Sequence, residues 1–176
     1  EYKTIEKLYD NKLSLDSCII GANIKRELGL LRGTSALLPI QQWFFNNFLS
    51  VEHYWNQSFL VRVPVLELNR LKSCISELVK HHDALRFRYK RVEGEVIQFY
   101  DENFLVEELR VLDIKDLGVP EGSEAFIVKL DEIFTDWQNG FNVESGPLYS
   151  IGYVCGYGDG TARLYFALHH LIVDAI

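Results

Sequence analysis

The most chemically suggestive residues are two adjacent histidines near the end of the chain. His169 and His170 follow an apolar run, ARLYFAL, that predicts a buried strand, and Asp174 comes four residues after His170. Neighbouring side chains of a strand point to opposite faces, so we expect one imidazole in a cleft and the other in packing. An imidazole titrates near neutral pH and can act as a general acid or base. The same pattern also suits two histidines that are simply hydrogen-bonded within a core.

Metal and thiol chemistries fit the sequence less well. A metal site needs three well-placed ligands, and HHxxxD is not a recognised metal-ligand spacing. The three cysteines, Cys18, Cys74 and Cys155, are far apart and form no CxxC pair, which argues against a disulfide framework or a zinc knuckle. Cys155 lies in a predicted strand, with no neighbour that would activate its thiol as a nucleophile. This cysteine usage fits a reducing, cytoplasmic setting.

Two further segments have structural interpretations. A second histidine pair, His81 and His82, ends a predicted helix, where the helix dipole favours positive charge. This position favours helix capping and packing over catalysis. The glycine-rich GYGDG at 156–160 lacks the following helix and lysine of a phosphate-binding loop, so it predicts a hairpin turn.

The composition restricts the classes of protein to which the chain can belong. With 176 residues, of which 48% are hydrophobic, it suits one folded domain or one lobe of a larger domain, not a disordered chain. A formal net charge of -7 argues against nucleic-acid binding, and no apolar run approaches the length of a membrane span. The first residues show no signal-peptide pattern. No methionine occurs, even at position 1, so we expect a piece of a longer polypeptide or a processed chain.

Hydrophobic periodicity predicts three helices. They are expected over 39–49, beginning at Pro39, over 66–81, and over 123–139, where Gly140 fits the C-terminal stop. The residues on their apolar faces that we expect to be buried are Trp43, Leu71, Leu78, Leu130, Phe134 and Trp137.

Alternating and continuous apolar runs predict the strands. QSFLVRV ends at Pro64, LRFRYK and VIQFY form a hairpin around Gly94, and FLVEEL could add a short strand. LYSIGYVC and ARLYFAL are apolar on both faces, so both are expected at the centre of a sheet covered by helices. The predicted fold class is mixed α/β, an α+β sandwich in which a mixed sheet is flanked by helices.

The segments around these features resemble a known family. HHLIVDAI resembles the HHxxxDG core motif of the condensation-domain superfamily of nonribosomal peptide synthetases. LLPIQQWFF is similar to its N-terminal motif around Pro-x-Gln, HHDALR to its second motif, and FNVESGPLY to the segment before the histidine strand. The resemblance covers 37–176, where we expect the N-terminal lobe of an epimerization- or condensation-type domain, truncated at the HHxxxD motif. Residues 1–36 are expected to be a linker or lead-in segment.

Two details favour the epimerization branch of the superfamily. PIQQWFF resembles its first motif, PIQxWFF, and HYWNQS resembles its H-[FYW]-N-Q-S/A segment, with one extra residue between His53 and Asn56. Ala175 departs from the glycine that usually follows the aspartate, and the chain ends at Ile176, before a Ser-Trp pair that would separate the branches. A condensation-domain fragment that forms peptide bonds and a degenerate domain that only docks carrier proteins are therefore alternatives.

The resemblance implies a chloramphenicol-acetyltransferase-like fold, in which two similar lobes form a V around an active-site tunnel. This chain would supply one lobe, and the C-terminal lobe would supply a glutamate as the second acid/base. The substrate would be an aminoacyl or peptidyl thioester on the phosphopantetheine arm of a peptidyl carrier protein, with no cofactor bound directly and no metal. Epimerization would remove and return the proton on the α-carbon beside the thioester.

The resemblance also assigns roles to individual residues. His170 and His169 are the expected catalytic residues, with His170 as the base or the group that stabilises the enolate, and His169 as the residue that holds the loop. Asp174 is expected to be structural. It would pair with an arginine, either Arg86 or one from the C-terminal lobe, because a buried unpaired carboxylate is unfavourable.

Overall fold

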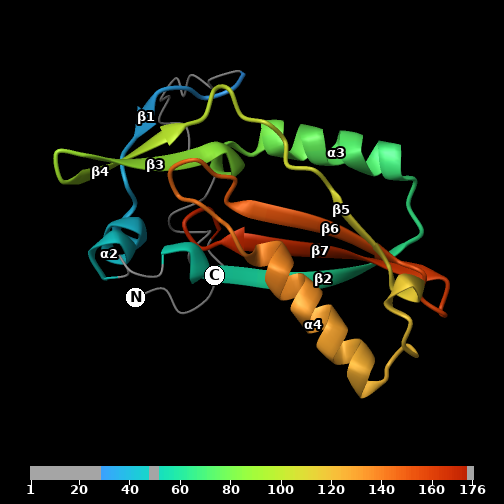
Figure 1. Ribbon diagram of the computed structural model, residues 1–176. Helices are drawn as coiled ribbons and strands as arrows, with labels where there is room; N and C mark the ends of the chain where they lie inside the picture. Colours follow the sequence, from blue (N-terminus) through green and yellow to red (C-terminus); the bar gives the residue numbers. More distant parts are fainter. Residues whose placement is uncertain (1–28, 48–51, 174–176) are drawn as a thin grey trace, which may run out of the picture.

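The computed structural model describes residues 29–47 and 52–173 (Figure 1). Its strands are β1 (Thr34–Ser35), β2 (Asn56–Pro64), β3 (Phe87–Val92), β4 (Glu95–Tyr100), β5 (Arg110–Asp113), β6 (Tyr149–Cys155) and β7 (Thr161–His169). Its α-helices are α2 (Pro39–Asn47), α3 (Leu68–His81) and α4 (Glu124–Gln138), and its short 3-10 helices are η2 (Glu52–Tyr54), η3 (Asp83–Arg86) and η4 (Ile114–Leu117). The predicted mixed arrangement of strands and helices is confirmed.

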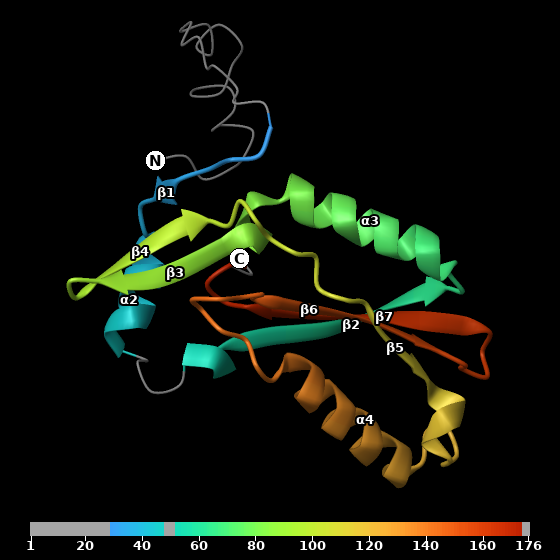
Figure 2. The same ribbon diagram turned by 45° about the horizontal axis from the view of Figure 1, so that its top comes forward.

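A four-stranded sheet, in the order β2-β7-β6-β5, carries the histidines at the end of β7. Strand β7 runs antiparallel to both of its neighbours, whereas β5 runs parallel to β6. Helices α3 and α4 lie on opposite sides of this sheet (Figures 1 and 2). Strands β7 and β6 each have a neighbouring strand on both sides, so both are internal to the sheet. The prediction that 162–168 forms an internal strand is therefore confirmed.

Helix α3 forms because its sequence supplies both a cap and an apolar stripe. The Glu67 carboxylate accepts hydrogen bonds from the first-turn backbone N–H groups of Asn69 at 2.8 Å and Arg70 at 2.7 Å. The buried residues of the helix are spaced by four and pack against the tyrosine-rich face of β6: Leu71, Ile75 and Val79. These contacts form the core on one side of the sheet.

Helix α4 covers the other side of the sheet. Ser123 caps it by accepting a hydrogen bond from the Phe126 N–H at 3.2 Å, and Gly140, with a φ of 93°, follows its end. The Trp137 ring lies so close to β6 that a Cβ on Gly152 would meet its Cζ3 atom at 2.0 Å. Glycine is therefore required at position 152 for the helix to approach the sheet.

The second sheet has three strands in the order β1-β4-β3, and the β3–β4 hairpin extends beyond the larger sheet (Figure 2). The hairpin turns at Glu93 and Gly94, which have positive φ values of 52° and 89°. Strand β3 also joins the loop before β6, because the Tyr89 N–H donates to the Val143 carbonyl oxygen at 2.8 Å. The predicted hairpin around Gly94 is confirmed.

Strand β2 forms one edge of the four-stranded sheet. Within the ranges that the structure describes, its hydrogen-bonded strand partner is β7 alone. Pro64 is the last residue of β2, as predicted. Three consecutive apolar side chains of the strand are exposed: Phe59, Leu60 and Val61.

Three expectations about the elements were wrong. Trp43 is 47% exposed, because α2 buries Gln41, Phe44 and Phe45 instead. Leu78 is 38% exposed, because it lies one position before Val79 and off the buried stripe of α3. No strand forms over FLVEEL in this described segment, and the short strand β5 follows it. Of the other expected core residues, Leu71 and Trp137 are buried, while Leu130 and Phe134 are half-buried.

Candidate active site

His169 ends β7 and is fully buried. Its backbone N–H donates to the Leu148 carbonyl oxygen at 2.9 Å, and its ring meets the Phe44 ring edge-on at 5.5 Å between centroids. The imidazole Nδ1 accepts the Leu171 N–H at 3.1 Å. A ring nitrogen that accepts a hydrogen bond carries no proton, so the geometry gives His169 a structural contact with the turn that follows the strand.

His170 is the first residue after β7 and is only partly buried. Its backbone N–H donates to the Trp55 carbonyl oxygen at 2.9 Å, and its ring lies 4.7 Å from the Trp55 ring, with an angle of 37° between the planes. His169 is therefore packed in the core and His170 is partly exposed, while the expectation that the His170 imidazole faces a cleft stays a prediction. The turn at His170, rather than strand alternation alone, produces this difference in burial.

The turn after β7 is held by side chains from distant segments. The Leu171 carbonyl oxygen accepts hydrogen bonds from Gln41 Nε2 and from the Tyr89 hydroxyl, each at 2.9 Å. Sequence reasoning included Gln41 only as part of a motif and missed Tyr89 and Trp55. A tyrosine on the apolar side of an amphipathic strand was the available signal for Tyr89, because a buried hydroxyl needs a hydrogen-bond partner.

Arg86 lies in η3 and is fully buried. Its guanidinium forms an ion pair with Asp83, donates to the Leu31 carbonyl oxygen at 3.3 Å, and lies 5.4 Å from the centre of the Phe104 ring. Asp174 lies outside the described residues, so its structural role and its pairing with Arg86 stay predictions. The HHDALR segment places an acidic partner for Arg86 three residues before it.

Arg88 connects β3 to the loop that precedes β6. Its Nε donates to the Ser145 carbonyl oxygen at 3.1 Å, and its guanidinium lies 3.4 Å from the Asp101 carboxylate. Burial lowers the pKa of Arg88, although Asp101 opposes this shift. The FNVESGPLY segment is thereby fixed to the strand that carries Tyr89.

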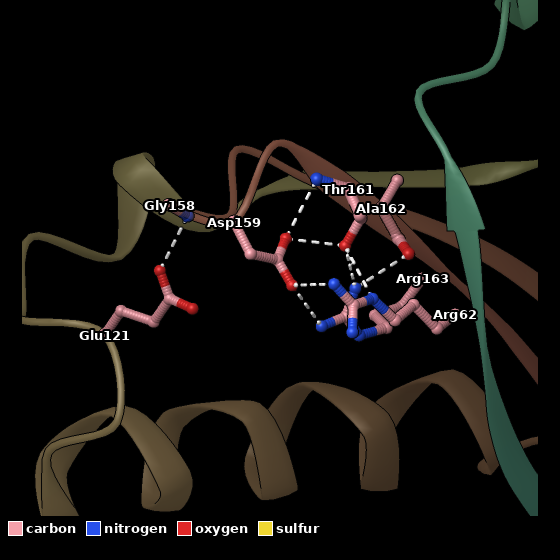
Figure 3. A network of polar contacts seen from close by, with 7 residues as sticks. All are labelled: Arg62, Glu121, Gly158, Asp159, Thr161, Ala162 and Arg163. Carbon is pink, nitrogen blue, oxygen red and sulfur yellow. Dashed lines mark hydrogen bonds and ion pairs between the residues drawn. The ribbon is translucent and has the colours of Figure 1, made fainter.

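A polar network lies at the opposite end of β7 from the histidines (Figure 3). The Asp159 carboxylate accepts hydrogen bonds from the Thr161 N–H at 2.8 Å and from Arg163 at 3.2 Å, and forms an ion pair with Arg62 at 3.1 Å. The hydrogen bonds from Thr161 are the main reason why the pKa of Asp159 is lowered to about 2. The network closes the β6–β7 hairpin and connects it to β2, which is a structural function, as predicted for GYGDG.

The described ranges contain no cluster of three or more His, Cys, Asp or Glu side chains that could hold a metal ion. Cys74 and Cys155 are both free thiols. Among the helices of these same ranges, none has the length and apolar character needed to cross a membrane.

Sequence comparison assigns the family. The profile described as "Condensation domain" matches residues 31–176. The chain belongs to the condensation-domain family. Across its whole length it is 39% identical to N-(5-amino-5-carboxypentanoyl)-L-cysteinyl-D-valine synthase of Penicillium rubens, of which it covers 4%. Over 90% of its length it is 33% identical to tyrocidine synthase 2 of Brevibacillus parabrevis, of which it also covers 4%. The chain thus spans a small part of the length of these relatives.

Solved structures of the family share the fold. The epimerization domain from the third module of tyrocidine synthetase B matches with a TM-score of 0.69 and 32% identity, over 84% of this chain and 32% of that one. The starter condensation domain of rhizomide synthetase matches with a TM-score of 0.64 and 17% identity, over 81% of this chain and 34% of that one. The chloramphenicol-acetyltransferase-like fold expected from the resemblance is confirmed.

Proposed function

We propose that this chain is the N-terminal half of a nonribosomal peptide synthetase epimerization domain. The observation that carries the proposal is the match to a solved epimerization domain at 32% identity, against 17% for a solved starter condensation domain. The name of one relative also contains a D-valine residue, and D-residues are the products that inversion of an α-carbon gives.

The geometry around His170 supports this chemistry. The α-hydrogen beside a thioester carbonyl is weakly acidic, so its removal needs a positioned base and a donor for the enolate oxygen. His170 is a partly exposed residue whose backbone is held by a hydrogen bond to Trp55, which suits either role. His169 is buried and acts on the turn, so it serves catalysis by holding His170 in place.

The substrate in this proposal is an aminoacyl or peptidyl thioester on the phosphopantetheine arm of a peptidyl carrier protein. A second lobe would complete the tunnel and supply the partner acid/base. The protein would work in the cytoplasm, a setting supported by the free thiols of Cys74 and Cys155.

A condensation activity is the second candidate, favoured by the family profile, which matches 31–176. In that case His170 would position the acceptor amine for formation of a peptide bond. The substitution at Ala175 is the observation behind a third candidate, a domain that only docks carrier proteins.

One experiment separates the three candidates. The full-length protein that carries this chain is incubated in D2O, with its upstream carrier loaded in turn with each proteinogenic L-amino acid and with an aminoacyl thioester on a second carrier as the amine acceptor. Deuterium at the α-carbon together with a D-product supports epimerization. A new amide bond without deuterium incorporation moves the assignment to condensation. If neither a D-product nor a new amide bond forms with any loaded carrier, the assignment moves to carrier docking alone.

A further inference from the structure

We propose that Gln41 and Tyr89 are positioning residues that fix His170 by clamping the carbonyl oxygen of Leu171. Gln41 Nε2 and the Tyr89 hydroxyl each donate to this oxygen at 2.9 Å. Gln41 Nε2 also lies 3.0 Å from the Tyr89 hydroxyl oxygen, to which it donates. The Gln41 amide nitrogen, the Tyr89 hydroxyl and the Leu171 carbonyl oxygen therefore form a triangle of mutual hydrogen bonds. Leu171 is the residue that follows His170.

The triangle is buried, and every polar side-chain atom of Gln41 and Tyr89 is hydrogen-bonded. Gln41 is 3% exposed, Tyr89 is 1% exposed and Leu171 is 3% exposed. Gln41 Oε1 accepts the Leu38 N–H at 2.8 Å, so both ends of the amide are engaged and its orientation is fixed. Burial raises the pKa of the Tyr89 hydroxyl well above its usual range, so it remains a donor at neutral pH.

The hydrogen bonds from Gln41 and Tyr89 to Leu171, here called the clamp, join three elements that are distant in sequence. Gln41 lies in α2, Tyr89 in β3, and Leu171 in the turn after β7. The rings of Phe45 and Tyr89 also pack with their centroids 5.2 Å apart, which ties α2 to β3 beside the clamp. The small sheet and α2 thus act on the turn through side chains and not through backbone pairing.

The clamp restricts the position of the His170 imidazole. The N–H of His170 donates to the Trp55 carbonyl oxygen and the N–H of Leu171 to His169 Nδ1, while the carbonyl oxygen of Leu171 accepts from Gln41 and Tyr89. These contacts restrain the backbone on both sides of His170, so the position of its ring depends mainly on its two side-chain torsions. A proton-transfer group must come within about 3 Å of its target, and a displacement of about 1 Å lowers the rate by on the order of 100-fold.

The inference rests on the proposed function for its effect on rate, and the test separates the two. Tyr89→Phe and Gln41→Leu each remove donors to the Leu171 carbonyl oxygen and keep most of the buried volume. Tyr153→Phe is the matched control. The Tyr153 hydroxyl is also buried and accepts the Leu66 N–H at 2.9 Å, but it lies opposite Leu164, well along β7 from the histidines.

In the full-length protein, we expect each clamp variant to lower kcat for α-proton exchange roughly 10-fold, and the double variant to lower it more than either single variant, without simple additivity because the two residues are in contact. The extent of carrier loading stays unchanged, because loading is a separate reaction that precedes α-proton exchange. Tyr153→Phe lowers the melting temperature by a similar amount and turns over at the wild-type rate. Equal kcat losses in control and clamp variants, or no loss in any of them, would overturn the inference.

Hydrogen exchange of the backbone amides of 170–172 provides a readout that needs no turnover. We expect faster exchange in Tyr89→Phe and Gln41→Leu than in wild type and in Tyr153→Phe. If wild type exchanges no α-proton, the proposed function fails while this measurement still decides the clamp. Unchanged protection in both clamp variants would reject the clamp, whatever the activity of the wild type.

Discussion

The Trp55 indole lies 4.7 Å from the His170 imidazole, centroid to centroid, and the Trp55 carbonyl oxygen accepts the His170 N–H at 2.9 Å. The register of β2 and β7 causes this relationship, because Asn56 pairs with His169 and the residues beyond each strand meet. The Trp55 ring also stacks on the Phe44 ring, with centroids 4.7 Å apart and an angle of 7° between the planes. His170 therefore stands against an aromatic stack that reaches into the core.

This stack predicts the effect of changing Trp55. Trp55→Ala keeps the backbone hydrogen bond but removes the ring surface against His170, so we expect turnover to fall roughly 10-fold. Because the side chain is only partly buried, we expect a loss of about 2 kcal/mol in stability. Trp55→Phe retains a ring and should recover most of the turnover. Equal activities for the two variants would show that ring contact does not orient His170.

His170→Ala should lower epimerization by roughly 10²–10⁴-fold, the usual contribution of a positioned acid or base. The fold and carrier binding should be retained, since the change removes one partly exposed ring. Deuterium incorporation at the α-carbon measures the first effect, and a thermal melt with a carrier-binding assay measures the second. His81→Ala, at an exposed histidine that ends α3, should leave all three unchanged. A His170→Ala variant that exchanges at the wild-type rate would remove this residue from the mechanism.

Asp83→Ala should destabilise the domain by about 3 kcal/mol, because it leaves the fully buried Arg86 guanidinium without its carboxylate. Glu77→Ala removes the partner of Lys80 from an exposed ion pair of α3 and should change stability by less than about 0.5 kcal/mol. Thermal unfolding of the two variants compares them. Similar losses would mean that another acidic group neutralises Arg86.

The Asp159 network predicts an acid-sensitive hairpin. The pKa of Asp159 is lowered from 3.8 to about 2 in the folded chain, so its carboxylate stabilises the fold above pH 3.8. That contribution should be lost as the pH falls from about 4 to about 2. Unfolding curves for wild type should therefore converge with those for Asp159→Asn over this interval. A constant difference between the two proteins from pH 5 to pH 2 would contradict the assignment.

Gly152→Ala should destabilise the domain by about 3 kcal/mol, because the new methyl group would overlap the Trp137 ring. Trp137→Leu removes the ring and is itself destabilising. The double variant should lose less stability than the two single variants together, since the leucine makes room for the methyl group. Strict additivity in thermal melts would show that α4 shifts away from the sheet instead.

Much of the larger sheet and its helices could be predicted from local patterns. The continuous apolar runs identified β6 and β7 as internal strands, and the four-residue spacing from Leu71 to Ile75 identified the buried face of α3. Helix α2 was different, because its own apolar residues are spread over more than one face, and the sequence does not say which face is buried. Its contact with the turn after β7 selects the face that contains the polar Gln41, and periodicity carries no information about that choice.

The candidate site was only partly predictable for the same reason. The HHxxxD motif located His169 and His170, but the contacts that distinguish them involve Trp55, Tyr89 and Leu171. These contacts depend on the register between β2 and β7 and on hydrogen bonds between distant segments. An imidazole's surroundings in such a turn are therefore set by tertiary packing, which the spacing of residues along the chain does not encode.

The pairing of β2 with β7 also affects how the chain folds during synthesis. Asn56 meets His169 across roughly 110 residues, so the strand that carries the histidines has a high contact order. At ribosomal speeds of about 5–20 residues per second, β2 would wait on the order of 5–20 s for its partner to be made. Throughout that interval the apolar residues Phe59, Leu60 and Val61 of β2 would have no strand partner. Slower translation of the segment between the two strands should therefore increase the demand for chaperones.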